Sequence, residues 1–309
     1  MSGKRLARPE RCILGIDVGG TNIRAGLFSP RTGSIRCAQA TETQSAKGGA
    51  HSLARVAELA REVVEAGRAK GLAVHRVGIG IPELVGPAGQ IESRCSLPWR
   101  ARSVHARLGA FGKVTIASDV FAAALAETRL GAGRNQKAFL YVTVGTGISC
   151  ALVIDGEVYT GPHNHALSFA SGPTVAVFDA AGRSAFETLE QRASGPALVR
   201  RAQQLGATAP DAIALCRTAL EQPGIARDIV DSAAAELAVH VAILANALEP
   251  TLIVLGGGLG CAPGRYWSVF RAALPRHTWG PHMRRLPVRQ AQLGTKAGLI
   301  GAALSAIEA

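Results

Sequence analysis

The sequence predicts an α/β protein of two lobes, each built on a sheet that begins with a hairpin. A buried strand, a Gly-rich turn and a second strand occupy residues 13–27, and the same order returns over residues 138–154. Elsewhere, segments with a helical apolar period alternate with short apolar strands, which is typical of α/β folds. The chain has 309 residues, enough for two such lobes without disulfides or a structural metal.

In the first half, apolar alternation predicts a hairpin, a third strand, and then strands separated by helices. Gly71 ends the first expected helix, Pro82 ends the fourth strand, and a glycine-rich break follows the second helix. The expected strands cover residues 13–18, 23–27, 34–38, 77–81 and 114–117, and the expected helices cover residues 51–70 and 119–130.

The second half restarts with the same hairpin and becomes mainly helical. We expect strands at residues 138–144, 148–154 and 252–255, and helices near residues 196–206, 210–222, 226–248 and 298–307. These patterns predict an N-terminal lobe over residues 1–118 and a C-terminal lobe over residues 119–297, with a hinge near residues 118–135. The last helix, residues 298–309, is expected to join the first lobe.

The formal net charge is +12, but the basic residues are spread along the chain. No basic run carries interleaved aromatic residues, so we expect a solvated basic surface and no nucleic-acid partner. A positive field would also attract a polyphosphate nucleotide.

The six cysteines lie far apart and form no Cys-x-x-Cys pair, which predicts reduced and mostly buried thiols. The first eleven residues lack the apolar segment of a signal peptide, and no apolar run approaches the roughly 20 residues that span a bilayer. We therefore expect a cytoplasmic protein without a membrane partner. The tryptophans Trp99, Trp267 and Trp279 are expected to pack inside the protein.

Three Gly-rich turns follow expected strands: Gly19-Gly20, Gly145-Thr146-Gly147 and Gly256-Gly257-Gly258. Glycine allows backbone N–H groups to approach an anion closely. Each turn alone is equally an ordinary loop, and none matches the P-loop or the dinucleotide-binding pattern. Three such turns at strand ends in two lobes favour phosphate binding.

Two aspartates stand at strand ends. Asp17 precedes the first Gly-rich turn and could hold a hydrated magnesium ion, while Thr21 and Asn22 could donate hydrogen bonds to phosphate oxygens. Asp119 lies where a strand ends and a helix begins, a position that suits a helix N-cap. A carboxylate there can also accept the proton of a substrate hydroxyl during phosphoryl transfer, and the two roles are compatible.

This ordered set resembles the ROK family, sugar kinases and repressors with a hinge-bending, two-lobed, actin-like (ribonuclease H-like) fold shared with hexokinase. The resemblance covers nearly the whole chain, from Gly15 to Ala302. It implies that Asp119 is the catalytic base. It also implies that one set of residues contacts the phosphates of the nucleotide and another lines its adenosine. The phosphate set is Asp17, Gly19, Gly20, Thr21, Gly145, Thr146 and Gly147, and the adenosine set is Gly256, Gly257 and Gly258.

Several positions depart from the family pattern around the sugar. The family's Asn before the catalytic Asp is Ser118, its sugar-binding Glu and His are Ser168 and Ser171, and the Asn of its N-L-P-x-W stretch is Ser96. The last Gly of its G-x-P-G turn is Glu83, which places a carboxylate near the expected sugar pocket. One sugar-binding glutamate is retained as Glu190, and His165 is a further candidate for acceptor contact.

The family's zinc ligands, one His and three Cys, align with residues that carry neither imidazole nor thiolate. These residues are Ser171, Ala181, Arg183 and Thr188. Because zinc sites need such ligands, the sequence predicts no zinc. The implied cofactors are ATP and Mg²⁺, and the resemblance also implies a homodimer.

The predicted function is ATP-dependent phosphorylation of a primary hydroxyl on a sugar or sugar-like polyol. A polar pocket is built hydroxyl by hydroxyl, so the serine substitutions indicate an acceptor other than glucose. Divergent ROK members in antibiotic biosynthesis suggest two classes, an amino sugar such as kanosamine, whose ammonium would pair with Glu83, and a C7 cyclitol such as valiolone. An ordinary kinase of glucose, fructose or mannose stays open.

Two alternatives belong to a different class. A ROK-like repressor needs a helix-turn-helix segment before the first phosphate turn, where only residues 1–12 precede the first expected strand. A sugar-sensing regulator without catalysis is disfavoured because Asp17, the glycine turns and Asp119 are all present.

Overall fold

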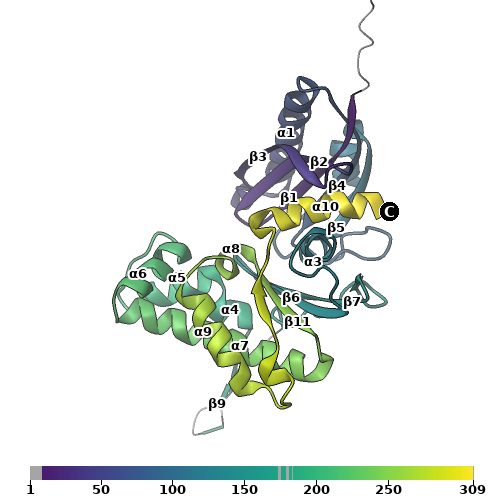
Figure 1. Ribbon diagram of the computed structural model, residues 1–309. Helices are drawn as coiled ribbons and strands as arrows, with labels where there is room; N and C mark the ends of the chain where they lie inside the picture. Colours follow the sequence, from purple (N-terminus) through teal and green to yellow (C-terminus); the bar gives the residue numbers. More distant parts are fainter. Residues whose placement is uncertain (1–8, 173–174, 179–180, 183, 309) are drawn as a thin grey trace, which may run out of the picture. The chain divides into compact units, whose positions relative to one another are not determined.

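A computed structural model describes residues 9–172, 175–178, 181–182 and 184–308. The chain divides into two compact units, coloured along the sequence in Figure 1. The first unit comprises Met1–Ala126, Gly161–His165 and Lys296–Ala309, and the second comprises Glu127–Thr160 and Ala166–Thr295.

The first unit contains a five-stranded sheet in the order β3-β2-β1-β4-β5. Its strands are β1 (Glu10–Val18), β2 (Asn22–Ser29), β3 (Ser34–Glu42), β4 (Leu72–Ile81) and β5 (Lys113–Ser118). β2 pairs antiparallel with β1 and β3, whereas β4 pairs parallel with β1 and β5. All five expected strands are present, and β3 is longer than its apolar residues indicated.

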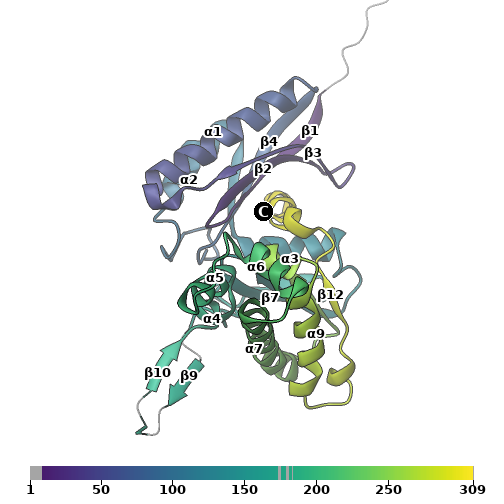
Figure 2. The same cartoon turned by 90° about the vertical axis from the view of Figure 1, so that its left-hand side faces the viewer.

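Helices cover both faces of this sheet. They are α1 (Gly49–Arg68), α2 (Ala101–Leu108), α10 (Ala297–Glu308) and the start of α3 (Asp119–Leu130), which continues into the second unit. Figure 2 shows α1 and α10 on opposite faces. The backbone of α10 lies directly against that of β4: a Cβ on Gly78 would be 1.6 Å from the carbonyl oxygen of Ala302, so only glycine fits there.

The second unit repeats this plan with a sheet in the order β12-β11-β6-β7-β8. Its strands are β6 (Ala138–Val144), β7 (Ile148–Ile154), β8 (Glu157–Tyr159), β11 (Leu252–Gly256) and β12 (Val288–Gln290). A hairpin with a third strand is again followed by two parallel strands, so the predicted duplication is confirmed. The three-residue strands β8 and β12 are too short to show a period of two.

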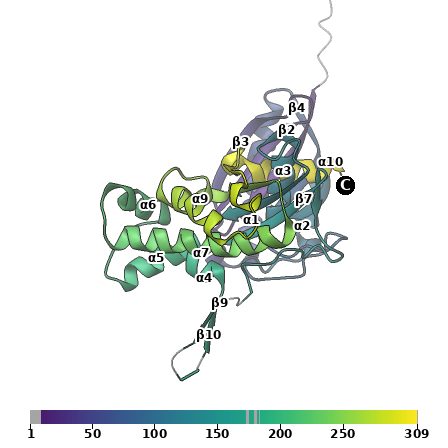
Figure 3. The ribbon, with the colours of Figure 1, turned by 60° about the horizontal axis from the view of Figure 1, so that its bottom comes forward.

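The second unit also carries most of the helices. They are α4 (Leu189–Ala193), α5 (Gly195–Gln204), α6 (Ala212–Glu221), α7 (Ile225–Leu248), α8 (Gly257–Gly260) and α9 (Arg265–His277). Figure 3 shows α5, α7 and α9 side by side, with the antiparallel pair β9 (Val175–Phe178) and β10 (Ser184–Glu187) beyond α4. Short 3₁₀ helices cover Ser45–Lys47, Gly109–Phe111, Met283–Arg285 and Gly294–Lys296.

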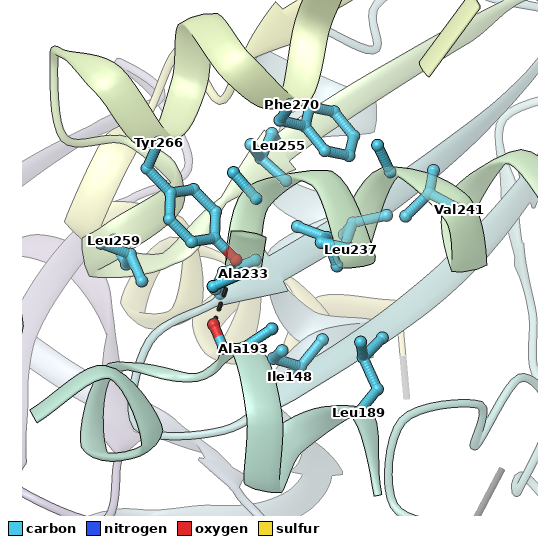
Figure 4. Close-up of a cluster of buried hydrophobic side chains, with 14 of the residues drawn as sticks. Ile148, Leu189, Ala193, Ala233, Leu237, Val241, Leu255, Leu259, Tyr266 and Phe270 are labelled. Carbon is cyan, nitrogen blue, oxygen red and sulfur yellow. Dashed lines mark hydrogen bonds between the residues drawn. The ribbon is translucent and has the colours of Figure 1, made fainter. Parts of the chain in front are cut away.

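The core of the second unit lies between its sheet and these helices (Figure 4). Leu237 of α7 and Phe270 of α9 are fully buried there. The Tyr266 hydroxyl donates a hydrogen bond to the Ala193 carbonyl at 3.1 Å, and burial raises the pKa of Tyr266. The tyrosine therefore remains a neutral donor that ties α9 to the end of α4.

Two expectations about side-chain burial need correction. Trp279 is 86% exposed and does not pack inside the protein. It follows the end of α9 and so lies on no packed helix face. Among the cysteines, Cys12, Cys150 and Cys216 are buried, whereas Cys95 is exposed on a loop. Within the described residues, no helix combines the length and apolarity needed to cross a membrane.

Candidate functional site

The strand register places the two candidate aspartates at one edge of the first sheet. Asp17 of β1 pairs with Gly80 of β4, and Gly80 pairs with Ala117 of β5. These parallel strands therefore end at the same edge, and Asp119 follows β5 as the first residue of α3. A Cβ on Gly80 would lie 3.4 Å from the Asp119 Cα, so glycine leaves room for the start of the helix.

Asp119 has the environment of a general base. Its Oδ1 accepts a hydrogen bond from the Val120 N–H at 2.7 Å, a local contact with the first turn of the helix. Burial raises the pKa of Asp119 to about 7, and the negative charges of Asp17 and Glu83 act in the same direction. A carboxylate with a pKa near neutrality can take up a proton during a reaction at physiological pH.

Asp17 is the second carboxylate of this edge. Its side chain is 16% exposed, and the Arg24 guanidinium lies 3.8 Å from Oδ2. Burial raises the pKa of Asp17 to about 6, and Arg24 opposes that shift. A Cβ on Gly298 would lie 2.6 Å from the Asp17 carboxylate, so the start of α10 needs glycine there. An oxygen ligand at a strand end fits a hydrated Mg²⁺ ion.

The first Gly-rich turn is held by the segment that follows β3. The Gly19 N–H donates to the Asn22 carbonyl at 2.8 Å, and the Thr43 N–H donates to the Thr21 carbonyl at 2.8 Å. The Thr43 hydroxyl also donates to the Gly19 carbonyl at 2.7 Å. These bonds fix the turn, and Thr21, Asn22 and their side chains lie at its exposed side. Nothing in the sequence pattern indicated Thr43.

The acceptor candidates of the first unit occupy different environments. Ser96 is exposed on a loop, and Ser118 is half-buried at the end of β5. His165 Nε2 lies 2.7 Å from the Glu92 carboxylate, which ties residues 161–165 to the loop after β4. Glu83 is only 5% exposed, and its carboxylate accepts hydrogen bonds from the backbone N–H groups of Ser96 and Leu97.

In the second unit, two of the predicted Gly-rich turns lie against each other. They follow the neighbouring parallel strands β6 and β11. Gly257 has φ +79°, and a Cβ there would lie 2.4 Å from the Val144 carbonyl oxygen. The Gly195 N–H donates to the Gly145 carbonyl at 2.8 Å and fixes the first of these turns. The expected turn at Gly256-Gly257-Gly258 is in fact the end of β11 followed by the short helix α8.

Glu190 supports the turn that contains Gly147. Its Oε2 accepts a hydrogen bond from the Ile148 N–H at 2.9 Å, and a Cβ on Gly147 would lie 2.6 Å from the same oxygen. A capping box between Thr188 and Gln191 fixes the start of α4, which carries Glu190. The geometry thus connects the retained glutamate with a glycine turn, a link that sequence spacing does not show.

The positions aligned with the family's zinc ligands are partly described. Ser171 and Ala181 are exposed, and Thr188 caps α4. Ser168, which aligns with the family's sugar-binding Glu, is exposed as well. Arg183 lies outside the described residues. The described part of the chain contains no group of three His, Cys, Asp or Glu side chains placed to hold a metal ion. The absence of zinc stays a prediction.

Glu127 is a buried carboxylate that motif reasoning missed. It is fully buried in α3 and accepts hydrogen bonds from the N–H groups of Ala132 at 2.7 Å, Gln292 at 3.1 Å and Leu293 at 2.8 Å. A buried charge is stable only when it is hydrogen-bonded in this way. A lone acidic residue in the apolar helix pattern was its only sequence signal.

Comparison with known proteins identifies the family. The ROK family model matches residues 13–309. The chain belongs to the ROK family. It is 32% identical over 305 residues to the bifunctional enzyme NanE/NanK of Brucella suis, an alignment that covers 96% of this chain and 53% of that protein. The chain therefore spans about half the length of that relative.

Two further proteins match over nearly their full length. A kanosamine kinase of Amycolatopsis mediterranei is 32% identical over 301 residues, with 94% of each chain covered. The structure of a ROK family glucokinase from Streptomyces griseus, in complex with glucose and AMPPNP, matches with a TM-score of 0.82 and 26% identity. That match covers 96% of this chain and 100% of the other, and it confirms the expected two-lobed fold.

Proposed function

We propose that this ROK-family chain is an ATP-dependent kinase that phosphorylates the primary hydroxyl of a sugar or a sugar-like polyol. The observation that carries the proposal is Asp119, a carboxylate at the start of α3 whose pKa is raised to about 7. Kinases of this type need a base that accepts the hydroxyl proton while other groups stabilise the phosphoryl group.

In the proposed reaction, the acceptor hydroxyl oxygen attacks the γ-phosphorus of ATP. The bond between the γ-phosphorus and its bridging oxygen breaks, ADP leaves, and the hydroxyl proton passes to Asp119. Mg²⁺ bound with the nucleotide supplies charge neutralisation at the phosphates, and Asp17 is the residue of the first unit that fits a hydrated ion.

The Gly-rich turns are proposed to bind the nucleotide. In the first unit the turn containing Gly19, Gly20, Thr21 and Asn22 is fixed by Thr43. In the second unit the Gly145–Gly147 turn and Gly256–Gly258 lie at the ends of adjacent strands, with glycine required at Gly257. Rigid backbone N–H groups bind phosphate oxygens without a reorganisation cost.

We propose a specialised acceptor, either an amino sugar like kanosamine or a C7 cyclitol like valiolone. The kanosamine kinase relative supports the first class. Ser168 and Ser171 are exposed and short, so they do not supply the Glu and His contacts that the family pattern uses for its sugar. A site that loses charged hydroxyl partners favours an acceptor with different groups.

The test is a panel of acceptors assayed for ATP consumption with the purified protein. Kanosamine, a valiolone-type cyclitol, glucose, fructose and mannose are compared at equal concentration, with product phosphorylation checked by mass spectrometry. We expect kcat/KM for one specialised acceptor to exceed that for glucose at least tenfold. Equal turnover of glucose contradicts the specialised acceptor and favours an ordinary hexose kinase. Sugar binding without ATP consumption favours a regulator without catalysis.

A further inference from the structure

The Glu83 carboxylate, which the sequence places near the expected acceptor pocket, accepts four hydrogen bonds from its own chain. It follows β4 by two residues and is 5% exposed. Its Oε1 accepts from the N–H groups of Ser96 and Leu97, both at 2.6 Å. Its Oε2 accepts from the Cys95 N–H at 2.9 Å and from the Ser93 hydroxyl. Each oxygen therefore already has two donors from the chain.

The segment between Glu83 and these donors, residues 84–93, forms a loop closed by hydrogen bonds. The Leu84 N–H donates to Ser93 Oγ at 2.8 Å, and the Glu92 N–H donates to the Leu84 carbonyl at 2.9 Å. An isolated bridge pairs Val85 with Ile91 inside this loop. The Ser93 hydroxyl accepts a hydrogen bond from Leu84 and donates one to Glu83. It therefore links the bonds that close the loop to the bonds around the carboxylate.

Residues 93–97 have no helix or strand of their own. Their far end is fixed by the fully buried Leu97 and by Trp99, whose Nε1 donates to the Gly49 carbonyl of α1 at 2.8 Å. Between these anchors, Arg94, Cys95 and Ser96 are exposed. The hydrogen bonds to the Glu83 carboxylate are therefore what holds the backbone of this short loop in place.

We propose that Glu83 is a positioning residue, which folds residues 93–97 and so places Ser96 toward the acceptor, and that its carboxylate does not bind the acceptor. The acceptor role of Ser96 rests on the proposed function. The sequence alone suggested an ion pair between Glu83 and a substrate ammonium. The four hydrogen bonds give the carboxylate a different task.

A carboxylate is the side chain that this arrangement requires. Four donors converge on two oxygens, and an ionised carboxylate offers about four acceptor positions and no donor. A glutamine would keep one acceptor oxygen, but its NH₂ group would face the Cys95 N–H. Charge-assisted bonds to backbone amides also offset the desolvation of the buried charge. Replacing Glu83 therefore leaves backbone donors without partners in a buried place.

The first experiment measures hydrogen exchange at the donor amides. Glu83→Ala and the isosteric Glu83→Gln are compared with the wild type and with Glu62→Gln, a change at an exposed glutamate of α1. We expect amide exchange in a peptide covering residues 93–98 to accelerate at least tenfold in both Glu83 variants and to stay unchanged in Glu62→Gln. Trypsin cleavage after Arg94 should accelerate in parallel. If Glu83→Ala does not fold, Glu83→Gln carries the test.

The second experiment separates positioning from direct binding. A positioning role lowers kcat/KM of Glu83→Gln by a similar factor for an amino sugar and for a neutral sugar, with the KM for ATP unchanged. A loss confined to the amino sugar overturns the proposal, because it indicates an ion pair with the substrate. Unchanged amide exchange in Glu83→Ala overturns it as well. A wild-type protein that phosphorylates no acceptor refutes the proposed function, while faster exchange would still establish the loop-folding role.

Discussion

The two five-stranded sheets have the same strand order but different chemistry at the edge where their parallel strands end. In the first unit this edge carries two carboxylates beside the Gly19-Gly20 turn, Asp17 near the end of β1 and Asp119 after β5. In the second unit the matching edge carries glycines, at Gly145–Gly147 after β6 and at Gly257 after β11. Both edges thus carry a Gly-rich turn, and the two candidate carboxylates belong to the first unit.

This difference has a direct electrostatic meaning. A half-buried carboxylate can take a proton or contact a cation, whereas a Gly-rich turn presents backbone N–H groups to an anion. Phosphoryl transfer needs both kinds of group, a base for the hydroxyl and donors for the phosphates. In this chain the candidate base lies in the first unit, and Gly-rich turns for the phosphates are proposed in both units. Variants at Asp119 and at Gly257 test these two roles separately.

Asp119→Asn tests the carboxylate edge and should have the largest effect. Asparagine keeps the size of the side chain but cannot accept the hydroxyl proton, so we expect kcat to fall about 10²–10⁴-fold. ATP affinity, measured by calorimetry, should stay unchanged, because the base acts on the acceptor hydroxyl and not on the nucleotide. Retained turnover in this variant would refute the assignment of Asp119 as the base.

Gly257→Ala tests the glycine edge of the second unit. The residue has φ +79°, and its new Cβ would lie 2.4 Å from the Val144 carbonyl oxygen. We expect the free energy of unfolding to fall by about 1–3 kcal/mol, because alanine is strained in this conformation. Gly258→Ala is the matched control, since a Cβ there meets no atom within 4 Å. Equal stability of the two variants in urea denaturation would show that the close approach is not required.

The pH dependence of activity should report the carboxylate edge alone. The pKa of Asp119 is raised to about 7, chiefly by burial. The base must be ionised, so kcat/KM should fall up to about tenfold per pH unit as the pH decreases below 7. Initial rates between pH 5.5 and 8.5 check this limb, and a rate independent of pH over that range would contradict it.

Stability should respond to pH in the opposite direction. The pKa values of Asp17 and Asp119 are raised in the folded protein from 3.8 to about 6 and about 7. The folded state therefore binds more protons, and this contribution is present at low pH and is lost as the pH rises from about 4 to about 7. We expect Asp119→Asn to be more stable than the wild type at pH 8 and to show a flatter stability profile in urea denaturation across this range.

The sequence predicted the parts of this edge that depend on pattern. Alternating apolar residues located β1, β2, β4 and β6, and motif spacing located the glycine turns and Asp119. It did not predict what the buried carboxylates contact. Glu83 and Glu127 accept bonds from backbone N–H groups, which every residue carries, so no side-chain pattern could reveal those partners. The contact of Gly257 with Val144 likewise depends on the pairing of β6 with β11, a long-range feature.

The helices of the second unit show the same limit. α7 has a clear apolar period and was predicted, whereas α9 (Arg265–His277) was missed, because its glycine N-cap and internal Pro275 look like a loop. Packing decides the outcome, since Phe270 and Tyr266 of α9 are buried against the core that contains α7. Tertiary contacts override a weak local preference of this kind.

Tyr266→Phe tests that packing and should have the smallest effect. The change removes the hydrogen bond from the hydroxyl to the Ala193 carbonyl but keeps the buried ring. A neutral buried hydrogen bond contributes about 0.5–1.5 kcal/mol, so the free energy of unfolding should fall by that amount. Tyr159→Phe, at a side chain 50% exposed on β8, should change it by less than about 0.5 kcal/mol. A larger loss in Tyr159→Phe than in Tyr266→Phe would mean that the α4–α9 contact is not what holds this side of the second unit together.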